Sequence, residues 1–496
     1  MGSISIGAYV PPDETIGGVL ACAFAIQLGQ STEAAIALAM PIATLCLAIK
    51  NILNAALPIL VDRADVFSAQ GNLKGVYAMH FLIGSTGIIE EFALGRWAQG
   101  GPVISFGKAT EERTGNKRLG EAIGALPIVG SMMLAIGYTV VMSWIFKYCW
   151  MGISGSLYAM GTDMATIGGT FGGTAPEAET LGEALSMMFS NGIFGIGNGV
   201  WLIVGLVASL AIMAFGVGNG IEKANKVMMP ALFFLFVVLG VYICTLPGAS
   251  EGYKYIFTLK PEGLLNPQVW VFAFGQAFFS LSVAGNGSVI YGSYLPKDED
   301  LPSSARNVAL FDTIAALLAA IVIIPAMAVI LGDGIVGMKG GPGLMFVYLV
   351  NVFNAMPGGR IVGMIFYICV LFAGVSSIVN LYEAPVAFLQ EKLHTNRVLS
   401  VVIIGAVGGV IALCIQPWTS QWMDVVSIYI CPLGALLAGI MFFWVMKKDT
   451  ALAAVHEGRT VGKKDISGWF YPLGKWVYCA ASLAALILGA IYGGIG

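Results

Sequence analysis

The stretch FAFGQAFFSLSVAGNGSVIYGSY, residues 272–294, decides the fold because it is apolar enough to cross a bilayer and is interrupted at its centre. Glycine has low helix propensity, and Asn and Ser compete for backbone hydrogen bonds. The centre therefore predicts two half-helices around an unwound segment that contains Ser280, Ser282, Gly285, Asn286, Gly287 and Ser288. Irregular backbone at membrane depth persists only where it is buried or lines a cavity, so the break predicts a binding site. The alternative is a continuous helix whose small residues let a neighbouring helix pack closely.

The composition is that of a polytopic membrane protein. Of the 496 residues, 57% are hydrophobic and 11% are charged, whereas soluble domains carry about 25% charged residues. The formal net charge of −3 argues against a nucleic-acid partner, and the eight Cys and three His show no metal or disulfide spacing. Because the N-terminus lacks the features of a signal peptide, we expect delivery through the chain's own membrane helices.

Ten apolar stretches from residue 76 onward are each long enough to cross a bilayer about 30 Å thick. They lie at about 76–98, 120–150, 199–222, 228–246, 268–294, 304–331, 360–390, 397–415, 424–446 and 467–493. Lys and Arg gather in alternate loops, which predicts that these loops are cytoplasmic and that the C-terminus lies outside. The long connections 153–195 and 333–359 would then be external, either as covers of a vestibule or as variable loops.

Polar side chains inside these stretches are functional candidates, because lipid disfavours them. Asp312 lies one to two turns into the span after the break, where its carboxylate suits Na⁺ or serves as a structural acid. Ala373, Ser376 and Ser377 share one helix face and offer part of a monovalent-cation site, unless the hydroxyls merely bond back to their own helix. Glu91 is interpreted first as a structural carboxylate bonded to neighbouring backbone and second as a transport residue.

From about residue 84 to the end, the chain resembles the neurotransmitter:sodium symporters. The resemblance rests on EFALGRW, GIEKANKVMMPALF, GQAFFSLSVAGNGSVIYGSYLPKDEDLPSSARNVALFDT and FAGVSSIVNLYE. It implies an all-α polytopic membrane protein with the inverted-repeat (LeuT-type) fold, which is not an enzyme and needs no cofactor beyond Na⁺ as the coupling ion. It further implies sodium-coupled symport of an amino acid or a related small zwitterion across the bacterial cytoplasmic membrane. A homodimer is a further partner to consider.

The same resemblance implies roles for single residues. Ser280 and Asp312 would complete a first sodium site, and the Ala373 carbonyl, Ser376 and Ser377 would complete a second. The residues implied for the substrate are Tyr138 for its carboxylate, Phe279 as a lid, and Ser282, Ala284, Asn286 and Gly287 along the unwound pocket. Asp424 would be the acidic half of an outer gate, and Glu391 that of an inner gate. Ala316 stands where chloride-dependent members place a serine, although Gln276 is present, so chloride dependence is left open.

Residues 1–82 resemble a different family, and we treat them as a unit separate from residues 83–496. IGAYVPPD, GQSTEAAIALAMPIA and ADVFSAQGNLKG are similar to the membrane subunit (IIC) of mannose/sorbose-class sugar phosphotransferase permeases. This fragment, with membrane segments at about 15–30 and 34–60, stands where the symporters have a first broken helix marked by Gly-Asn-x-Trp-Arg-Phe-Pro. We therefore expect weak transport or none, and we weigh two alternatives: a membrane component of a sugar phosphotransferase system, and an inactive chimeric transporter.

Overall fold

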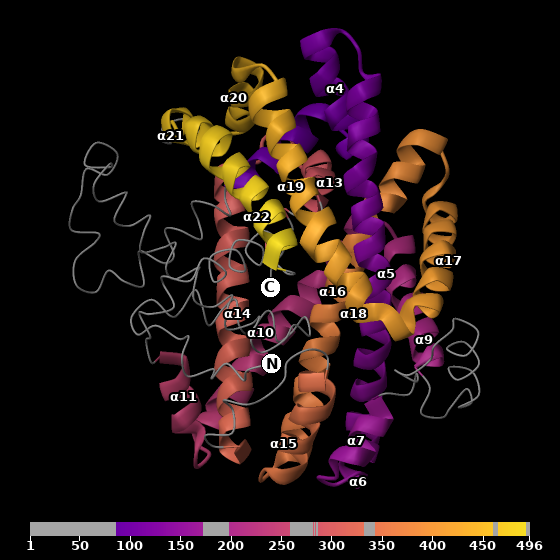
Figure 1. Ribbon diagram of the computed structural model, residues 1–496, viewed down its shortest axis with the longest axis vertical. Coiled ribbons are helices and arrows are strands. Elements are labelled where there is room, and N and C mark those ends of the chain that lie inside the picture. The colour runs from indigo at the N-terminus through magenta and orange to yellow at the C-terminus, as the bar shows by residue number, and fades with distance from the viewer. Residues whose placement is uncertain are drawn as a thin grey trace, which may run out of the picture.

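The computed structural model describes residues 86–171, 198–257, 281, 283, 286–331, 343–459 and 465–492. The described part of the chain is helical, as predicted, and it contains no strand. Figure 1 shows the long helices running roughly along the longest axis, with short helices at both ends of the bundle.

The first described helix covers residues 86–98. In the first half of the chain it is followed by α4 (Pro102–Thr114), α5 (Arg118–Ser154), α6 (Ser156–Ala159), α7 (Met164–Phe171), α9 (Gly199–Ala214), η3 (Val217–Ile221), α10 (Glu222–Cys244) and α11 (Ala249–Phe257). After the break come α13 (Gly287–Tyr294), α14 (Leu301–Leu331), η6 (Leu344–Tyr348), α15 (Leu349–Ala355), α16 (Gly359–Leu393) and α17 (Arg397–Ile415). The C-terminal part contains η7 (Gln416–Trp418), α18 (Thr419–Val425), η8 (Val426–Ile430), α19 (Cys431–Ile440), η9 (Met441–Val445), α20 (Lys448–His456), α21 (Ser467–Pro472), η10 (Leu473–Tyr478) and α22 (Cys479–Tyr492).

Seven described helical segments are long and apolar enough to cross a membrane. They are Arg118–Ser154, Val217–Cys244, Leu301–Ile330, Gly359–Leu393, Arg397–Ile415, Thr419–Val445 and Ser467–Ile491. The predicted break between the spans 199–222 and 228–246 was misplaced. The chain turns at Gly216, whose φ of 88° favours glycine, and η3 continues into α10.

Three connections contain more helix than the sequence pattern indicated. The stretch between the first two predicted spans holds α4, which has Pro102 at its start and Gly115 with φ 76° at its end. Pro fits the first helical turn and Gly fits a left-handed C-terminal position, so this polar helix has clear boundaries that hydropathy does not detect. The connections 153–195 and 333–359 include the ordered helices α6, α7, η6 and α15.

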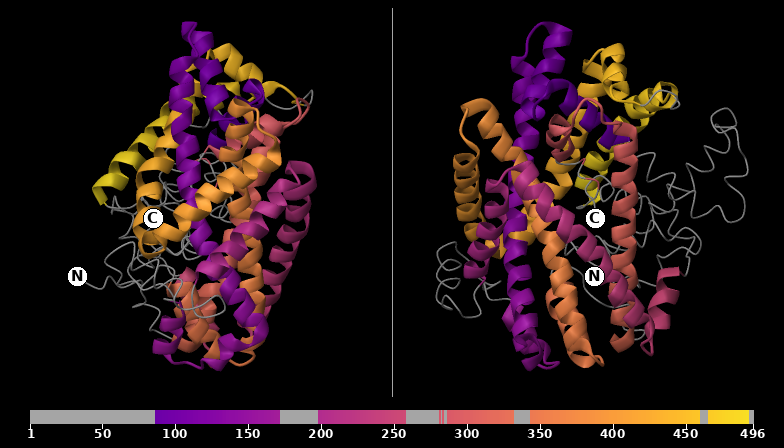
Figure 2. Two further views of the ribbon diagram at one scale, coloured as in Figure 1. Left: turned by 90° about the vertical axis from the view of Figure 1, so that its right-hand side faces the viewer. Right: turned by 180° about the vertical axis from the view of Figure 1, so that it is seen from behind.

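The two longest helices, α5 and α16, pack along each other and form the centre of the bundle. α16 also contacts α10, α13 and α17, and Figure 2 shows α10 running obliquely across the bundle. Both long helices contain an internal proline, Pro127 and Pro385, which neighbouring helices make tolerable in membrane spans. A buried aromatic cluster that includes Tyr148, Phe346 and Tyr367 joins α5, η6 and α16.

Candidate functional site

The described part of the stretch 272–294 contains the predicted break, but the break ends at Asn286, because Gly287 and Ser288 form the first turn of α13. α13 begins only at Gly287, and Leu281, Val283 and Asn286 lie in turns. Asn286 has φ 50° and ψ 24°, a left-handed conformation that Asn tolerates better than most other residues. The predicted site residues Phe279, Ser280, Ser282 and Ala284, together with Gln276, lie outside the described residues.

The side chain of Asn286 connects the break before α13 to two other helices by hydrogen bonds. It is fully buried, and its Nδ2 donates to Glu91 Oε1 at 2.9 Å and to the Gly434 carbonyl at 3.1 Å. Glu91 lies on helix 86–98 and Gly434 on α19, so one amide joins three parts of the chain. The resemblance implied that Asn286 lines the pocket; the structure turns its amide toward these neighbours.

Glu91 is buried at the N-terminal end of α13. Besides the bond from Asn286, the backbone amides of Ser288 and Val289 face its carboxylate. A helix N-terminus favours an anion, so Glu91 stabilises the start of the half-helix. This arrangement fits the first interpretation of Glu91, a structural carboxylate bonded to neighbouring backbone.

The three residues proposed for the second sodium site converge on one point of α16. Ser376 Oγ and Ser377 Oγ donate to the Ala373 carbonyl at 2.8 and 2.9 Å, and all three residues are half-buried. These bonds are the back-bonding that the sequence left as an alternative. They also gather three oxygens on one face, and each hydroxyl keeps lone pairs with which to bind a hard cation.

Asp312 lies deeper in its helix than the sequence indicated. α14 begins at Leu301, so Asp312 is about three turns in, rather than one to two. The predicted start at residue 304 was late because the polar first turn of α14, with Ser303 and Ser304, lacks the apolar character that marks a span. Asp312 is half-buried and already interacts with a neighbour.

Tyr138 offers a free hydroxyl on α5. Its side chain is 9% exposed, and the hydroxyl has no hydrogen-bond partner within the part of the chain that the structure describes. The adjacent Thr139 bonds instead to Tyr382 on α16, at 2.8 Å. The Tyr138 hydroxyl is therefore available to an external acceptor such as a carboxylate.

The two predicted gate acids differ in their surroundings. Asp424 on α18 is exposed, and it has no basic partner among the described residues. Glu391, near the C-terminal end of α16, accepts a hydrogen bond from the backbone N–H of Gly101 at 2.8 Å. Gly101 precedes α4, so Glu391 caps that helix.

The sequence analysis missed a buried ion pair between α16 and the start of α17. Arg397 donates from Nη1 and Nη2 to the two oxygens of the fully buried Glu383, at 2.9 and 2.7 Å. The Tyr294 hydroxyl of α13 donates to Glu383 Oε1 at 2.8 Å, and Tyr291 bonds to Asn380. The available signal was an acid inside an apolar span followed by an arginine in the next loop.

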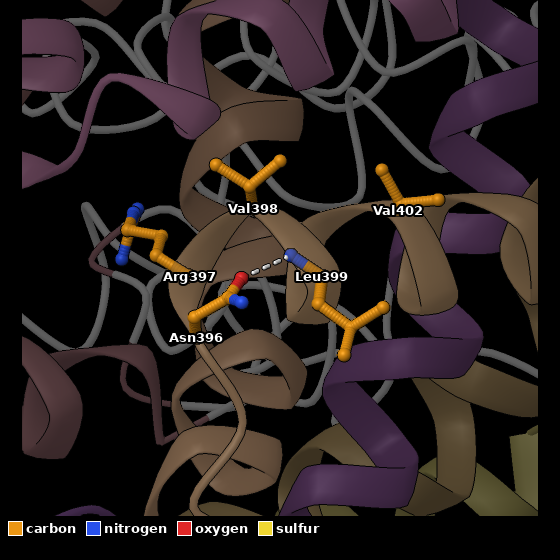
Figure 3. Close-up of a pocket in the computed structure, with 5 residues that line it drawn as sticks. All are labelled: Asn396, Arg397, Val398, Leu399 and Val402. Atoms are coloured by element: carbon orange, nitrogen blue, oxygen red, sulfur yellow. Dashed lines mark hydrogen bonds between the residues drawn. The ribbon is translucent and has the colours of Figure 1, made fainter.

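The pair lies beside a surface hollow of about 530 Å³ at the start of α17, lined by Asn396, Arg397, Val398, Leu399 and Val402. In Figure 3 the Asn396 side-chain oxygen accepts a hydrogen bond from the backbone N–H of Leu399. The Arg397 guanidinium points away from Leu399 and Val402. None of the residues predicted to bind sodium or substrate lines this hollow.

Arg96 is a second feature that the sequence analysis did not single out. Its guanidinium is buried and donates to the carbonyls of Pro296, Glu299, Ala454 and Glu457, at 2.7 to 3.4 Å. Two acceptors belong to the turn before α14 and two to the end of α20. Arg96 therefore fastens helix 86–98 to both segments.

Comparison with known proteins identifies the family. The profile of the Sodium:neurotransmitter symporter family matches residues 175–488, well over half of the chain. The chain belongs to this family. Membership makes it a multi-pass membrane transporter of the sodium-dependent class rather than an enzyme, as the resemblance implied.

Relatives and a solved structure agree with this symporter assignment. An uncharacterized sodium-dependent transporter of Bacillus subtilis is 29% identical, with 79% of this chain and 84% of that protein covered. One from Methanocaldococcus jannaschii is 27% identical over 82% of this chain and 78% of that protein. The crystal structure of MhsT with L-phenylalanine matches with a TM-score of 0.68 and 25% identity, covering 97% of this chain and 96% of that one. This match supports the LeuT-type fold.

A second profile, PTS system sorbose-specific iic component, matches residues 1–175. It agrees with the resemblance seen in IGAYVPPD and the neighbouring motifs. This match runs past residue 82. The alignments with the sodium-dependent transporters cover about four fifths of the chain, so they also include residues before 175 and overlap with it. The domain boundary at residue 82 therefore stays a prediction.

Proposed function

We propose that this symporter couples Na⁺ entry to uptake of an amino acid or a related small zwitterion across the bacterial cytoplasmic membrane. The observation that carries the proposal is the group of three oxygens from Ala373, Ser376 and Ser377 on α16. Hydroxyl and carbonyl oxygens are ligands that a hard monovalent cation prefers. Asp312 would contribute a carboxylate to a separate sodium site, together with Ser280.

Two features of the described residues support an amino acid or a related zwitterion as the substrate. The Tyr138 hydroxyl has no partner among the described residues and would donate to a substrate carboxylate. α13 begins only at Gly287, and the ends of interrupted helices line the substrate pocket in other transporters with discontinuous helices. The bound L-phenylalanine of MhsT makes an amino acid the first substrate to test.

The cycle follows from the position of these groups. Na⁺ and the zwitterion would bind together near the break, and the bundle would then rock to expose them to the cytoplasm. Asp424 would control access from outside, and Glu391 would control exit to the inside. Because the symporter motif of the first broken helix is absent from the sequence, we expect very weak uptake or none.

The test is uptake of a labelled amino-acid panel into proteoliposomes with Na⁺ or K⁺ outside. Ser377→Ala and Asp312→Asn should each remove the sodium-dependent part. Ser209→Ala is the matched control, because Ser209 is a buried serine on α9 whose Oγ also bonds the carbonyl four residues earlier, at 2.8 Å. Uptake that is equal in Na⁺ and K⁺, or equal loss in the control, would refute the proposal.

The profile match over residues 1–175 favours one alternative, a membrane component of a sugar phosphotransferase system. Reconstitution with cognate soluble subunits and a phosphoryl donor would decide this, because only this alternative predicts phosphorylated sugar as the product.

A further inference from the structure

Glu90 is a fully buried carboxyl for which the symport mechanism has no use. Both of its oxygens lack a hydrogen-bond partner among the described residues. An ionised carboxylate without partners is very unfavourable in a protein interior. With no partner among the described residues, the Glu90 carboxyl is suited to hold a proton or a bound cation.

Among the described residues, no group donates a hydrogen bond to Glu90, and the nearby Tyr478 hydroxyl donates to the Ala435 carbonyl at 3.4 Å. Glu91 Oε2 and Asn286 Oδ1, at the same junction, are also buried and unpartnered in the described part of the chain. Tyr478 and Cys479, from η10 and α22, are the titratable groups that face Glu90 from the adjoining helix. Lys475 of η10 does not neutralise the pair, because its Nζ lies over the Trp444 ring, 4.4 Å from the centroid. One added proton would supply the missing donor.

Glu91 is the member of the pair that is better placed to carry a negative charge. It accepts the bond from Asn286 Nδ2 at 2.9 Å, and the first amides of α13 face it. A second negative charge on the neighbouring residue is disfavoured by repulsion. Two such carboxyls take up and release protons as a pair, and here the geometry gives the proton to Glu90.

We propose that Glu90 is a proton-binding site of this transporter, linked to the break before α13 through Glu91 and Asn286. A proton needs a single oxygen, whereas an alkali cation needs several that are aimed at one point. When the helices rearrange around the break, the contacts of Glu91 change, and water reaching Glu90 takes the proton from its O–H bond. Proton release and uptake then accompany the transport cycle.

The first test reads protonation directly and does not depend on transport. Infrared spectra of the full chain in nanodiscs at neutral pH should contain the C=O stretch of a protonated carboxylic acid, which Glu90→Gln removes. Glu111→Gln, an exposed acid on α4, is the matched control and should keep the band. A band that persists in full in Glu90→Gln would overturn the proposal. Failure of Glu90→Gln to fold, with Glu111→Gln folded, would also overturn it, because Gln is the neutral isostere of the protonated acid.

The second test rests on the proposed symport and measures coupling. Sodium-driven uptake by wild type and Glu111→Gln should differ between opposite imposed pH gradients, whereas Glu90→Gln should give a ratio near one. Wild-type uptake that ignores the gradient would refute the coupling. If wild type shows no uptake at all, the proposed symport fails, and the infrared result still decides whether Glu90 holds a proton.

Discussion

Replacing Arg397 by Met tests whether the buried pair with Glu383 supports the fold. Arg397 is 18% exposed at its side chain and Glu383 is not exposed. The change leaves a buried carboxylate without its cation, which costs about 3 to 5 kcal/mol in comparable buried pairs. The Tyr294 hydroxyl still donates to Glu383 at 2.8 Å, so we expect the lower end, about 3 kcal/mol.

A double-mutant cycle separates the loss of the pair from the loss of the arginine itself. Glu383→Gln combined with Arg397→Met removes both charges, and similar replacements in other proteins are often close to neutral. We expect the double variant to lie within about 1 kcal/mol of wild type. The measurement is the free energy of unfolding in mixed micelles titrated with a denaturing detergent.

Lys226→Met is the control, because Lys226 forms an ion pair with Glu222 at 2.6 Å with both side chains more than half exposed. Solvent screening makes such surface pairs weak, so no measurable change is expected. An Arg397→Met variant as stable as the Lys226→Met variant, or a double variant whose losses simply add, would refute the reasoning.

Three further predictions each concern one residue. Arg96→Lys keeps the charge, but an ammonium group cannot donate to the same four carbonyls as the planar guanidinium. The end of α20 should then be held less firmly, and trypsin should cleave at Arg459 faster than in wild type. Equal cleavage rates would contradict this role of Arg96. Asn286→Ala should be about 1 kcal/mol less stable than Asn286→Gly. Both variants lose the hydrogen bonds to Glu91 and Gly434, but only alanine is strained at φ 50°. The measurement is the free energy of unfolding of the two variants, and equal values would contradict the prediction. Cys244 is exposed at the end of α10. It should react with a membrane-impermeant maleimide added to intact cells, and Cys244→Ser is the control. Labelling of Cys244 only after lysis would reverse the predicted orientation.

Local sequence patterns predicted the features that depend on local chemistry. The apolar stretches gave the spans of α5, α14, α16 and α17 to within a few residues, because bilayer thickness fixes their length. The Gly- and Asn-rich centre of 272–294 predicted the break before α13, since Gly and Asn tolerate a left-handed backbone better than most other residues. The spacing of Ala373, Ser376 and Ser377 placed their oxygens together because helix geometry alone does so.

Features that depend on distant contacts could not be read in this way. The four acceptors of Arg96 are backbone carbonyls about 200 to 360 residues away, and a carbonyl leaves no mark in the sequence. The same limit applies to Asn286, whose conformation the Gly-rich context predicted but whose amide direction depends on Glu91 and Gly434. Pairing of Glu383 with Arg397 depends on how α17 turns back along α16.

Glu90 and Glu91 show why the environment, rather than the residue type, decides chemistry in this site. Neighbours on an α-helix point about 100° apart, so two identical acids in IIEEFALGRW face different partners. Glu91 meets the Asn286 amide and the start of α13, which stabilise a negative charge. Glu90 meets the side of η10 and α22, where the described residues offer its oxygens no donor. One acid therefore contacts the start of the broken helix, and its neighbour is left to carry a proton.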